Sequence, residues 1–194
     1  YGMSKEDKVL HRLISTGKFK CVVIDAPFVN ASTSCIGVDH RRAQYEVAAK
    51  TVMENNCKRI LYIAGKRNGY VTDERIRGME DLVKEKNLTM LVRNGEFSEL
   101  QARNITLKYA KNKDIVVCAS DLMAIGAMKA LIQMDIFRPV CGFDGIILMG
   151  YVGKQMNTVR QDFASISESA MEELQELMNG GYGRNIVMKH SLVR

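Results

Sequence analysis

Charged side chains that follow predicted strands are the features of this sequence best suited to chemistry. Asp25, Asp121 and Asp144 each follow an apolar run, and Arg75 stands early in a helical segment after the glycine-flanked loop 65–69. A carboxylate accepts hydrogen bonds from neighbouring hydroxyls and an arginine donates a planar fork, so the set suits a polyhydroxylated ligand. The alternative is that each Asp caps the next helix or turn. Both interpretations stay open for Asp121, whereas the Gly-Phe-Asp-Gly context of Asp144 favours a ligand role.

Sequence motifs for catalysis and for cofactors are missing. There is no Gly-x-Gly-x-x-Gly after a strand, no phosphate-binding Walker loop and no Gly-x-Ser-x-Gly. The three histidines, His11, His40 and His190, fall on predicted helix faces or near the end of the chain, where a surface or structural role is expected. Without a nucleophile, base and orienting group in a recognisable arrangement, we expect no enzyme activity and no cofactor.

Five cysteines give an odd number and no Cys-x-x-Cys pair. Cys21, Cys118 and Cys141 lie in or beside apolar strand-like runs. We therefore expect buried free thiols in a reducing compartment, which favours the cytoplasm. Metal ligands are not clustered at short spacing, so no metal site is expected.

The 194 residues are enough for one large domain or two modest lobes, with an ordinary 46% of hydrophobic and 26% of charged residues. No apolar stretch is long enough to predict a membrane span, and no secretory signal is expected in the sequence as given. The net charge is +6. However, basic residues are mixed with acidic ones, and the tightest cluster, 40–42, opens a predicted helix, so we interpret the charge as a solvated surface rather than a nucleic-acid site.

Short β-branched runs alternate with longer amphipathic segments, a pattern typical of an α/β protein with a parallel sheet covered on both faces. Such sheets bind ligands beyond the carboxyl ends of their strands. The pattern predicts helices at 4–16, 41–55, 72–86, 98–111, 121–134 and 163–178, and strands at 21–25, 35–38, 59–64, 89–93, 114–118, 140–143, 157–160 and 186–188. Ser4 and Ser98 are the predicted N-caps of the helices that they begin.

Two features suggest missing material. No strand precedes the first helix, and the connection through 138–140 is unusually short for a βα pattern.

Several segments together resemble the effector domain of the LacI/GalR family of bacterial transcription repressors. Each is weak alone, but their order and spacing across nearly the whole chain are specific: 21–25, 36–43, 58–65, 75–78, 118–127, 141–145, 157–162 and 191–194.

The resemblance implies a periplasmic-binding-protein-like fold of type I, with two Rossmann-like lobes joined by crossing strands and an effector between them. The N-terminal lobe would comprise 1–56 plus 163–182, with its first strands missing, and the C-terminal lobe 57–160 plus 183–194. The family's helix-turn-helix domain is not in this chain, so operator DNA would be bound by a separate N-terminal domain of the longer protein.

The family's ligand contacts fall on Arg75 in the Arg-x-x-Gly motif, on Ser120 before Asp121, on Asp144 after Gly-Phe and on Gln161 of the Arg-Gln-Asp segment. Some sugar-responsive members have Asn where this chain has Ser120, so the resemblance does not fix the class of effector.

The loop after the first predicted strand also lines the family's cleft, which nominates Ala26 and Phe28. Either Phe28 or Tyr70 would stack on the apolar face of a pyranose or a purine.

The sequence thus predicts an effector-sensing domain of a transcription repressor that binds a small polar molecule, a sugar or a purine. The alternative is a periplasmic sugar-binding protein of a transporter, and a third interpretation is a sugar- or nucleotide-modifying enzyme. We expect a homodimer, with the helix 121–134 and the segment 148–153 on the C-terminal-lobe surface that pairs.

Overall fold

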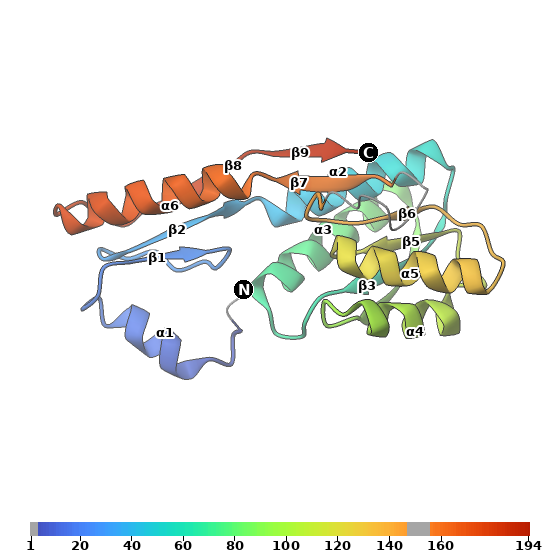
Figure 1. The fold of residues 1–194 in the computed structure, drawn as a ribbon, viewed down its shortest axis with the longest axis horizontal. Helices are drawn as coiled ribbons and strands as arrows, with labels where there is room; N and C mark the ends of the chain where they lie inside the picture. Colours follow the sequence, from blue (N-terminus) through green and yellow to red (C-terminus); the bar gives the residue numbers. More distant parts are fainter. Residues whose placement is uncertain (1–3, 147–155) are drawn as a thin grey trace. The chain divides into compact units, whose positions relative to one another are not determined.

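The computed structural model describes residues 4–146 and 156–194, and the chain forms two compact units (Figure 1). Unit 1 comprises Tyr1–Asp39, Asn68–Val71 and Gln161–His190, whereas unit 2 comprises His40–Arg67, Thr72–Arg160 and Ser191–Arg194. The segment 148–153, expected at a subunit surface, lies outside the described residues.

Unit 1 is built on a three-stranded parallel sheet in the order β1-β2-β8, formed by β1 (Cys21–Ile24), β2 (Thr33–Val38) and β8 (Asn185–Met188). The helix α6 (Phe163–Met178) packs against β1 and β2 (Figure 1). By contrast, α1 (Lys8–Ser15) buries only Ile14 and leaves its other apolar side chains at least partly exposed.

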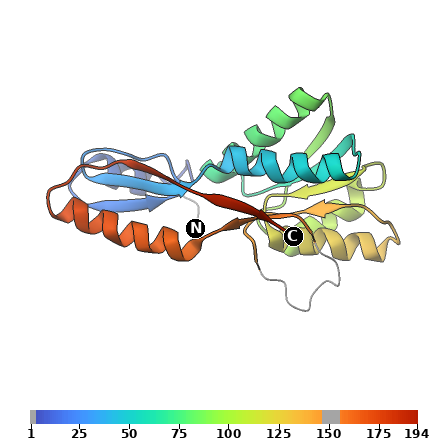
Figure 2. The ribbon, with the colours of Figure 1, turned by 90° about the horizontal axis from the view of Figure 1, so that it is seen from above.

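Unit 2 contains a four-stranded parallel sheet in the order β4-β3-β5-β6. Its strands are β3 (Arg59–Ala64), β4 (Thr89–Asn94), β5 (Ile115–Cys118) and β6 (Val140–Cys141). Helices α2 and α3 cover one face and α4 and α5 the other (Figure 2). They span α2 (His40–Glu54), α3 (Tyr70–Lys86), α4 (Glu99–Tyr109) and α5 (Asp121–Gln133). Apart from the exposed Arg59 at the start of β3, the central strands β3 and β5 are buried, as their largely apolar sequences predict.

Two of the boundaries between the units fall inside β7 (Thr158–Gln161) and β9 (His190–Val193), strands that pair with each other. The pattern did not predict β9, because only Lys189 separates it from β8 and no turn residue marks the break.

The units divide the chain differently from the lobes expected from the resemblance. Helix α2 belongs to unit 2 rather than to the lobe 1–56, and β8 pairs with β2 in unit 1 rather than joining 57–160. Alternating strands and helices identify the elements, but they do not say which sheet a strand joins, because that depends on pairing between distant residues.

The helix caps follow the sequence in one case and differ in another. Ser98 caps α4 as predicted, since its side chain accepts a hydrogen bond from the backbone N–H of Gln101. The prediction that Ser4 caps the first helix is wrong. Asp7 caps α1, and Ser4 instead bridges to Gly69.

All five cysteines are free, and four of them are buried. Burial raises the pKa of Cys118 and that of Cys141, the latter to about 12. These thiols therefore stay protonated at neutral pH and pack as small apolar side chains, as the sequence predicted.

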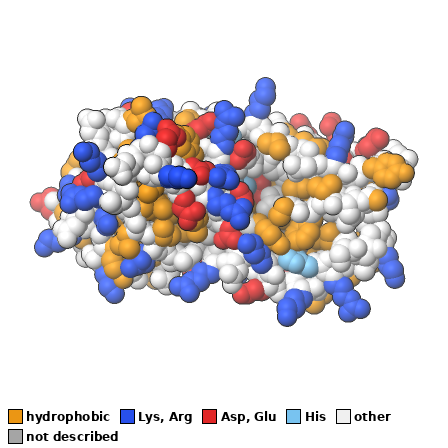
Figure 3. All heavy atoms as spheres, turned by 180° about the vertical axis from the view of Figure 1, so that it is seen from behind, with side chains coloured by type: hydrophobic (Ala, Val, Ile, Leu, Met, Phe, Trp, Pro, Cys, Tyr) orange, Lys and Arg blue, Asp and Glu red, His pale blue; other side chains and the backbone are white. Residues whose placement is uncertain are grey.

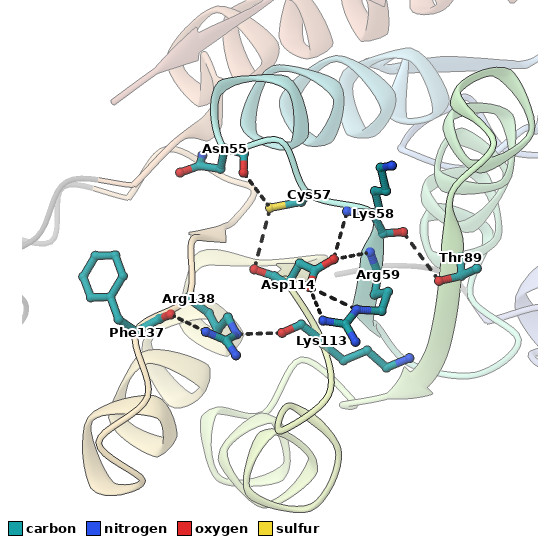
Figure 4. A network of polar contacts seen from close by, with 9 residues as sticks. All are labelled: Asn55, Cys57, Lys58, Arg59, Thr89, Lys113, Asp114, Phe137 and Arg138. Carbon is teal, nitrogen blue, oxygen red and sulfur yellow. Dashed lines mark hydrogen bonds and ion pairs between the residues drawn. The ribbon is translucent and has the colours of Figure 1, made fainter.

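A polar network at the amino ends of the unit 2 strands centres on Asp114 (Figure 4). Its carboxylate accepts hydrogen bonds from the backbone N–H groups of Lys58 and Arg59 at 3.0 and 2.8 Å, and from the Arg59 guanidinium at 2.7 and 3.1 Å. These bonds hold the pKa of Asp114 well below its usual range. The network fixes the start of β3 against the start of β5.

We expect Asp114→Asn to lower the free energy of unfolding by about 1–2 kcal/mol, because it replaces charge-assisted hydrogen bonds by neutral ones. The matched control is Asp81→Asn: Asp81 and its partner Arg41 are both exposed to solvent, so the loss of this ion pair should cost clearly less than the loss at Asp114. Urea unfolding of both variants measures the difference. Equal losses would contradict the structural role given to Asp114.

Candidate ligand site at the carboxyl edge of the unit 2 sheet

The carboxyl ends of the unit 2 strands bring together three segments that are far apart in the sequence. Ala119 follows β5, Phe143 and Asp144 follow β6, and Arg75 reaches both segments from α3. This is the sheet edge at which α/β proteins bind ligands.

Arg75 is 3% exposed and is held from several sides. Its terminal nitrogen Nη1 donates to the carbonyl oxygen of Ala119, and its Nε and Nη2 lie 3.4 and 3.3 Å from His40 Nδ1. The guanidinium carbon lies 3.5 Å from the centre of the Phe143 ring, a cation–π arrangement. The side chain is thus fixed in orientation, as a residue that recognises a ligand by a planar fork must be.

Asp144 lies 3.8 Å from Arg75, measured from Oδ1 to Nη2, and its side chain is 24% exposed. Its φ is +117°, a backbone conformation that is strained for a residue with a side chain. The loop is held in place by the hydrogen bond from the Asp144 N–H to the carbonyl of Val159 at 2.9 Å. The structure therefore places the predicted cation and carboxylate next to each other, in a loop that keeps the carboxylate partly open to solvent.

Ser120 and Asp121 are both buried and form hydrogen bonds with other groups of the protein. The Ser120 hydroxyl caps α5 by accepting from the Met123 N–H at 3.3 Å. Asp121 is fully buried and accepts from the Thr158 hydroxyl at 2.7 Å and from the Ile146 N–H at 2.8 Å. Their ligand contacts stay predictions. Through these hydrogen bonds, Asp121 has a structural role: it links α5 to the loop that carries Asp144.

The other predicted ligand residues, Ala26, Phe28 and Gln161, belong to unit 1. Ala26 and Gln161 are buried. The Phe28 ring packs edge-on against the rings of His11 and Tyr70, with centroids 4.8 and 5.5 Å apart. Their ligand contacts remain predictions, and both aromatic side chains nominated for stacking already belong to one cluster.

Two residues of the unit 2 site were not found from the sequence. His40 was expected to have only a surface or structural role, yet it is 6% exposed and contacts Arg75, because α2 turns its first residue toward α3. Arg41 and Arg42 next to it do face solvent in ion pairs. No local signal separates the three, since they form one polar run at the start of a helix.

The second missed residue is Phe97, which follows β4 at the same sheet edge and is half-buried. A side chain at Gly65 would come within 2.1 Å of the Phe97 ring, so the glycine after β3 is what leaves room for the aromatic ring. Phe97 also has a φ of +56°, which fixes an unusual turn into α4. The close approach of Gly65 and Phe97 could not be predicted from the sequence, because 32 positions separate the two residues.

Comparisons with known proteins identify the family. The model of a family described as a periplasmic binding protein-like domain matches residues 49–194. The chain belongs to this family. The fold agrees: a structure of the Lac repressor bound to ONPG in the repressed state matches with a TM-score of 0.83 at 18% identity, covering all of this chain and 61% of the repressor chain.

Curated relatives of this periplasmic-binding-protein-like domain are regulators of transcription. The regulator MalR of Clostridium butyricum is 28% identical over 171 residues, which is 82% of this chain and 51% of MalR. The repressor PurR of Vibrio vulnificus is 26% identical over 149 residues, which is 72% of this chain and 45% of PurR. The domain is thus of the effector-binding kind found in LacI-family regulators, and it spans about half the length of these relatives.

Surface charge on the domain is mixed in sign. On the face shown in Figure 3, Lys and Arg side chains are interspersed with Asp and Glu. This pattern agrees with the interpretation of the net charge as a solvated surface. Within 4–146 and 156–194, no helix has the length and apolar character that crossing a membrane requires.

Asp121 should make the stability of the domain depend on pH. Burial raises its pKa from 3.8 to about 6. A carboxyl group whose pKa is raised on folding stabilises the folded state below its unfolded pKa, and this contribution is lost as the pH rises through the folded pKa. Lowering the pH from 7 to 5 should therefore add about 1 kcal/mol of stability through this group.

The measurement compares the urea unfolding of the wild type and of Asp121→Asn at both pH values. The contributions of all other carboxyl groups to the pH dependence then cancel. The stabilisation at pH 5 should disappear in Asp121→Asn. A pH response identical in the two proteins would show that Asp121 does not titrate in this range.

Proposed function

We propose that this domain binds a sugar as its effector, with Arg75 and Asp144 as the central polar contacts, and thereby controls a separate DNA-binding domain. The observation that carries the proposal is the placement of these two side chains 3.8 Å apart at the carboxyl edge of the unit 2 sheet. An arginine stacked on Phe143 can donate to two oxygens of one ligand, and the partly exposed carboxylate can accept from a hydroxyl.

Aromatic and polar groups at this edge match the two kinds of surface that a sugar presents. The half-buried ring of Phe97, a residue the sequence did not nominate, offers an apolar surface for the C–H face of a pyranose. A purine would stack on the same Phe97 ring. Because the chain is similar to PurR, purines are the second class of ligand to test.

Isothermal titration with a panel of sugars, including cellobiose and galactose, and of purines, including guanine and hypoxanthine, tests the proposal. We expect at least one sugar to bind, and Asp144→Asn to weaken it by about tenfold or more, through loss of a charged hydrogen-bond acceptor. The control Asp135→Asn changes an exposed aspartate that also has a positive φ, and should leave the affinity unchanged. Binding of purines alone would overturn the choice of sugar.

Regulation is favoured over transport because the curated relatives named above are regulators of transcription. We propose that effector binding changes the arrangement of the two lobes and that operator DNA is contacted outside the residues of this chain. The five free thiols support a reducing compartment, the cytoplasm, over the periplasm of the alternative solute-binding protein.

The expected homodimer would use the outer surface of α5. An open groove of about 690 Å³ between α4 and α5 is lined by Leu100 and Ile132 together with the charged Glu99 and Lys129. Ile132 is 72% exposed, which is unusual for an isoleucine in a helix.

We therefore expect Ile132→Glu to shift a dimer toward monomer in sedimentation equilibrium, by about tenfold or more in the dissociation constant. Val187→Glu introduces the same charge at a similarly exposed position of unit 1 and serves as the control. A monomeric wild type, or a dimer indifferent to Ile132→Glu, would contradict this assignment of the interface.

A further inference from the structure

His40 is the side chain at the unit 2 site whose chemistry the proposed function leaves unexplained. It is 6% exposed, and both Nε and Nη2 of Arg75 point at the same ring nitrogen, Nδ1, from 3.4 and 3.3 Å. Since a guanidinium carries only donors, Nδ1 must be the acceptor and must carry no proton. The contact therefore requires the neutral imidazole with its proton on Nε2.

The ring of His40 is also fixed by packing. It lies 5.7 Å from the ring of Phe143, centre to centre, and the same Phe143 ring supports the Arg75 guanidinium. Histidine, arginine and phenylalanine thus come from α2, α3 and the loop after β6 and contact one another. Two hydrogen-bond acceptors, His40 Nδ1 and the Ala119 carbonyl, define the plane of the guanidinium.

We infer that neutral His40 is the positioning residue for Arg75, and that protonation of His40 releases the guanidinium from the orientation in which it recognises the effector. The consequence for effector binding rests on the proposed function, whereas the positioning itself does not. An imidazolium would place an N–H and a positive charge against an arginine that offers neither an acceptor nor a negative charge.

The charged groups around this contact come from three elements. Arg75 of α3 contacts His40 directly, Asp144 lies 3.8 Å from the same guanidinium, and Arg41 on α2 is engaged with Asp81 at 2.6 Å. Asp144 carries a negative charge next to the guanidinium, so it would still attract Arg75 when the histidine is charged.

The test uses the Arg75 Nε–H signal in ¹⁵N–¹H correlation spectra of the whole chain, assigned by its loss in Arg75→Lys. At pH 8 we expect a protected signal in the wild type. In His40→Phe, which keeps a ring against Phe143 but has no acceptor, this proton should exchange with water about tenfold faster. His40→Asn, which offers an amide oxygen near the position of Nδ1, should restore the protection.

A pH titration provides the second readout, which holds even if His40→Phe does not fold. Between pH 8 and pH 5 the Arg75 signal should lose protection in the wild type and keep it in His40→Asn. An unchanged Arg75 signal in His40→Phe, or identical titrations of wild type and His40→Asn, overturns the inference and leaves the proposed function standing. Conversely, sugar binding that is indifferent to Arg75 would remove the proposed function and leave the positioning of Arg75 intact.

Discussion

Replacing Arg75 by alanine should weaken sugar binding by about 100-fold or more. Removal of one partner from a buried, charged hydrogen-bonded contact at a binding site costs about 2–5 kcal/mol, and every 1.4 kcal/mol is a factor of ten in affinity. Arg75→Lys should also bind at least about tenfold more weakly, because an ammonium keeps the charge but cannot reproduce the planar fork that Ala119 and His40 hold. Isothermal titration with the sugar found in the panel measures both effects.

Arg77→Ala is the matched control, since it removes the same type of side chain two positions along α3. Arg77 is exposed and pairs with Glu74 on its own helix, so its loss should leave affinity unchanged. Thermal melting of each variant separates lost binding from lost folding, because Arg75→Ala also leaves two acceptors without their donor. If Arg75→Ala and Arg77→Ala bind the sugar equally well, the assignment of the site to Arg75 is wrong.

The second large effect is expected from Gly78→Ala. A Cβ atom at Gly78 would lie 2.1 Å from the backbone oxygen of Arg41, so α3 must carry a glycine where it crosses α2. In an unobstructed helix the same change would stabilise by about 1 kcal/mol. Here the obstacle is backbone that cannot rotate away, and we expect a net loss of about 3 kcal/mol. For a chain of this length the melting temperature should fall by roughly 6–12 °C.

Glu80→Ala controls for helix propensity, because Glu80 is exposed on the same helix. Its melting temperature should stay within about 2 °C of the wild type. Since α2 and α3 carry His40 and Arg75, separation of these helices in Gly78→Ala should also reduce sugar affinity. A Gly78→Ala protein as stable as the wild type would show that the two helices pack less closely than described.

The polar centre of the site could be predicted from the sequence because it depends on local order. Asp144 directly follows a strand and Arg75 begins a helix after a strand and loop, so the rule that parallel strands end at one edge brings them together. The same local patterns predicted most helices and strands, as well as the Ser98 cap and the buried thiols.

What the sequence could not predict depends on contacts between distant residues. The burial of His40 follows from the crossing of α2 and α3, and that of Phe97 from the missing side chain at Gly65. The association of α2 with unit 2 likewise comes from the docking of whole elements. Asp121 shows a further limit: its position after a strand left a structural role and a ligand contact equally open, and the sequence did not indicate that it is a buried hydrogen-bond acceptor for Thr158 and Ile146.

The most direct measurement is a double-mutant cycle on sugar affinity with Arg75→Ala, Asp144→Ala and the double variant. If the cation and the carboxylate hold one ligand together, each single change should weaken binding strongly, and the double variant should bind only slightly more weakly than either. Sugar binding of wild-type strength in both single variants would contradict the assignment of the effector site to this edge of the sheet.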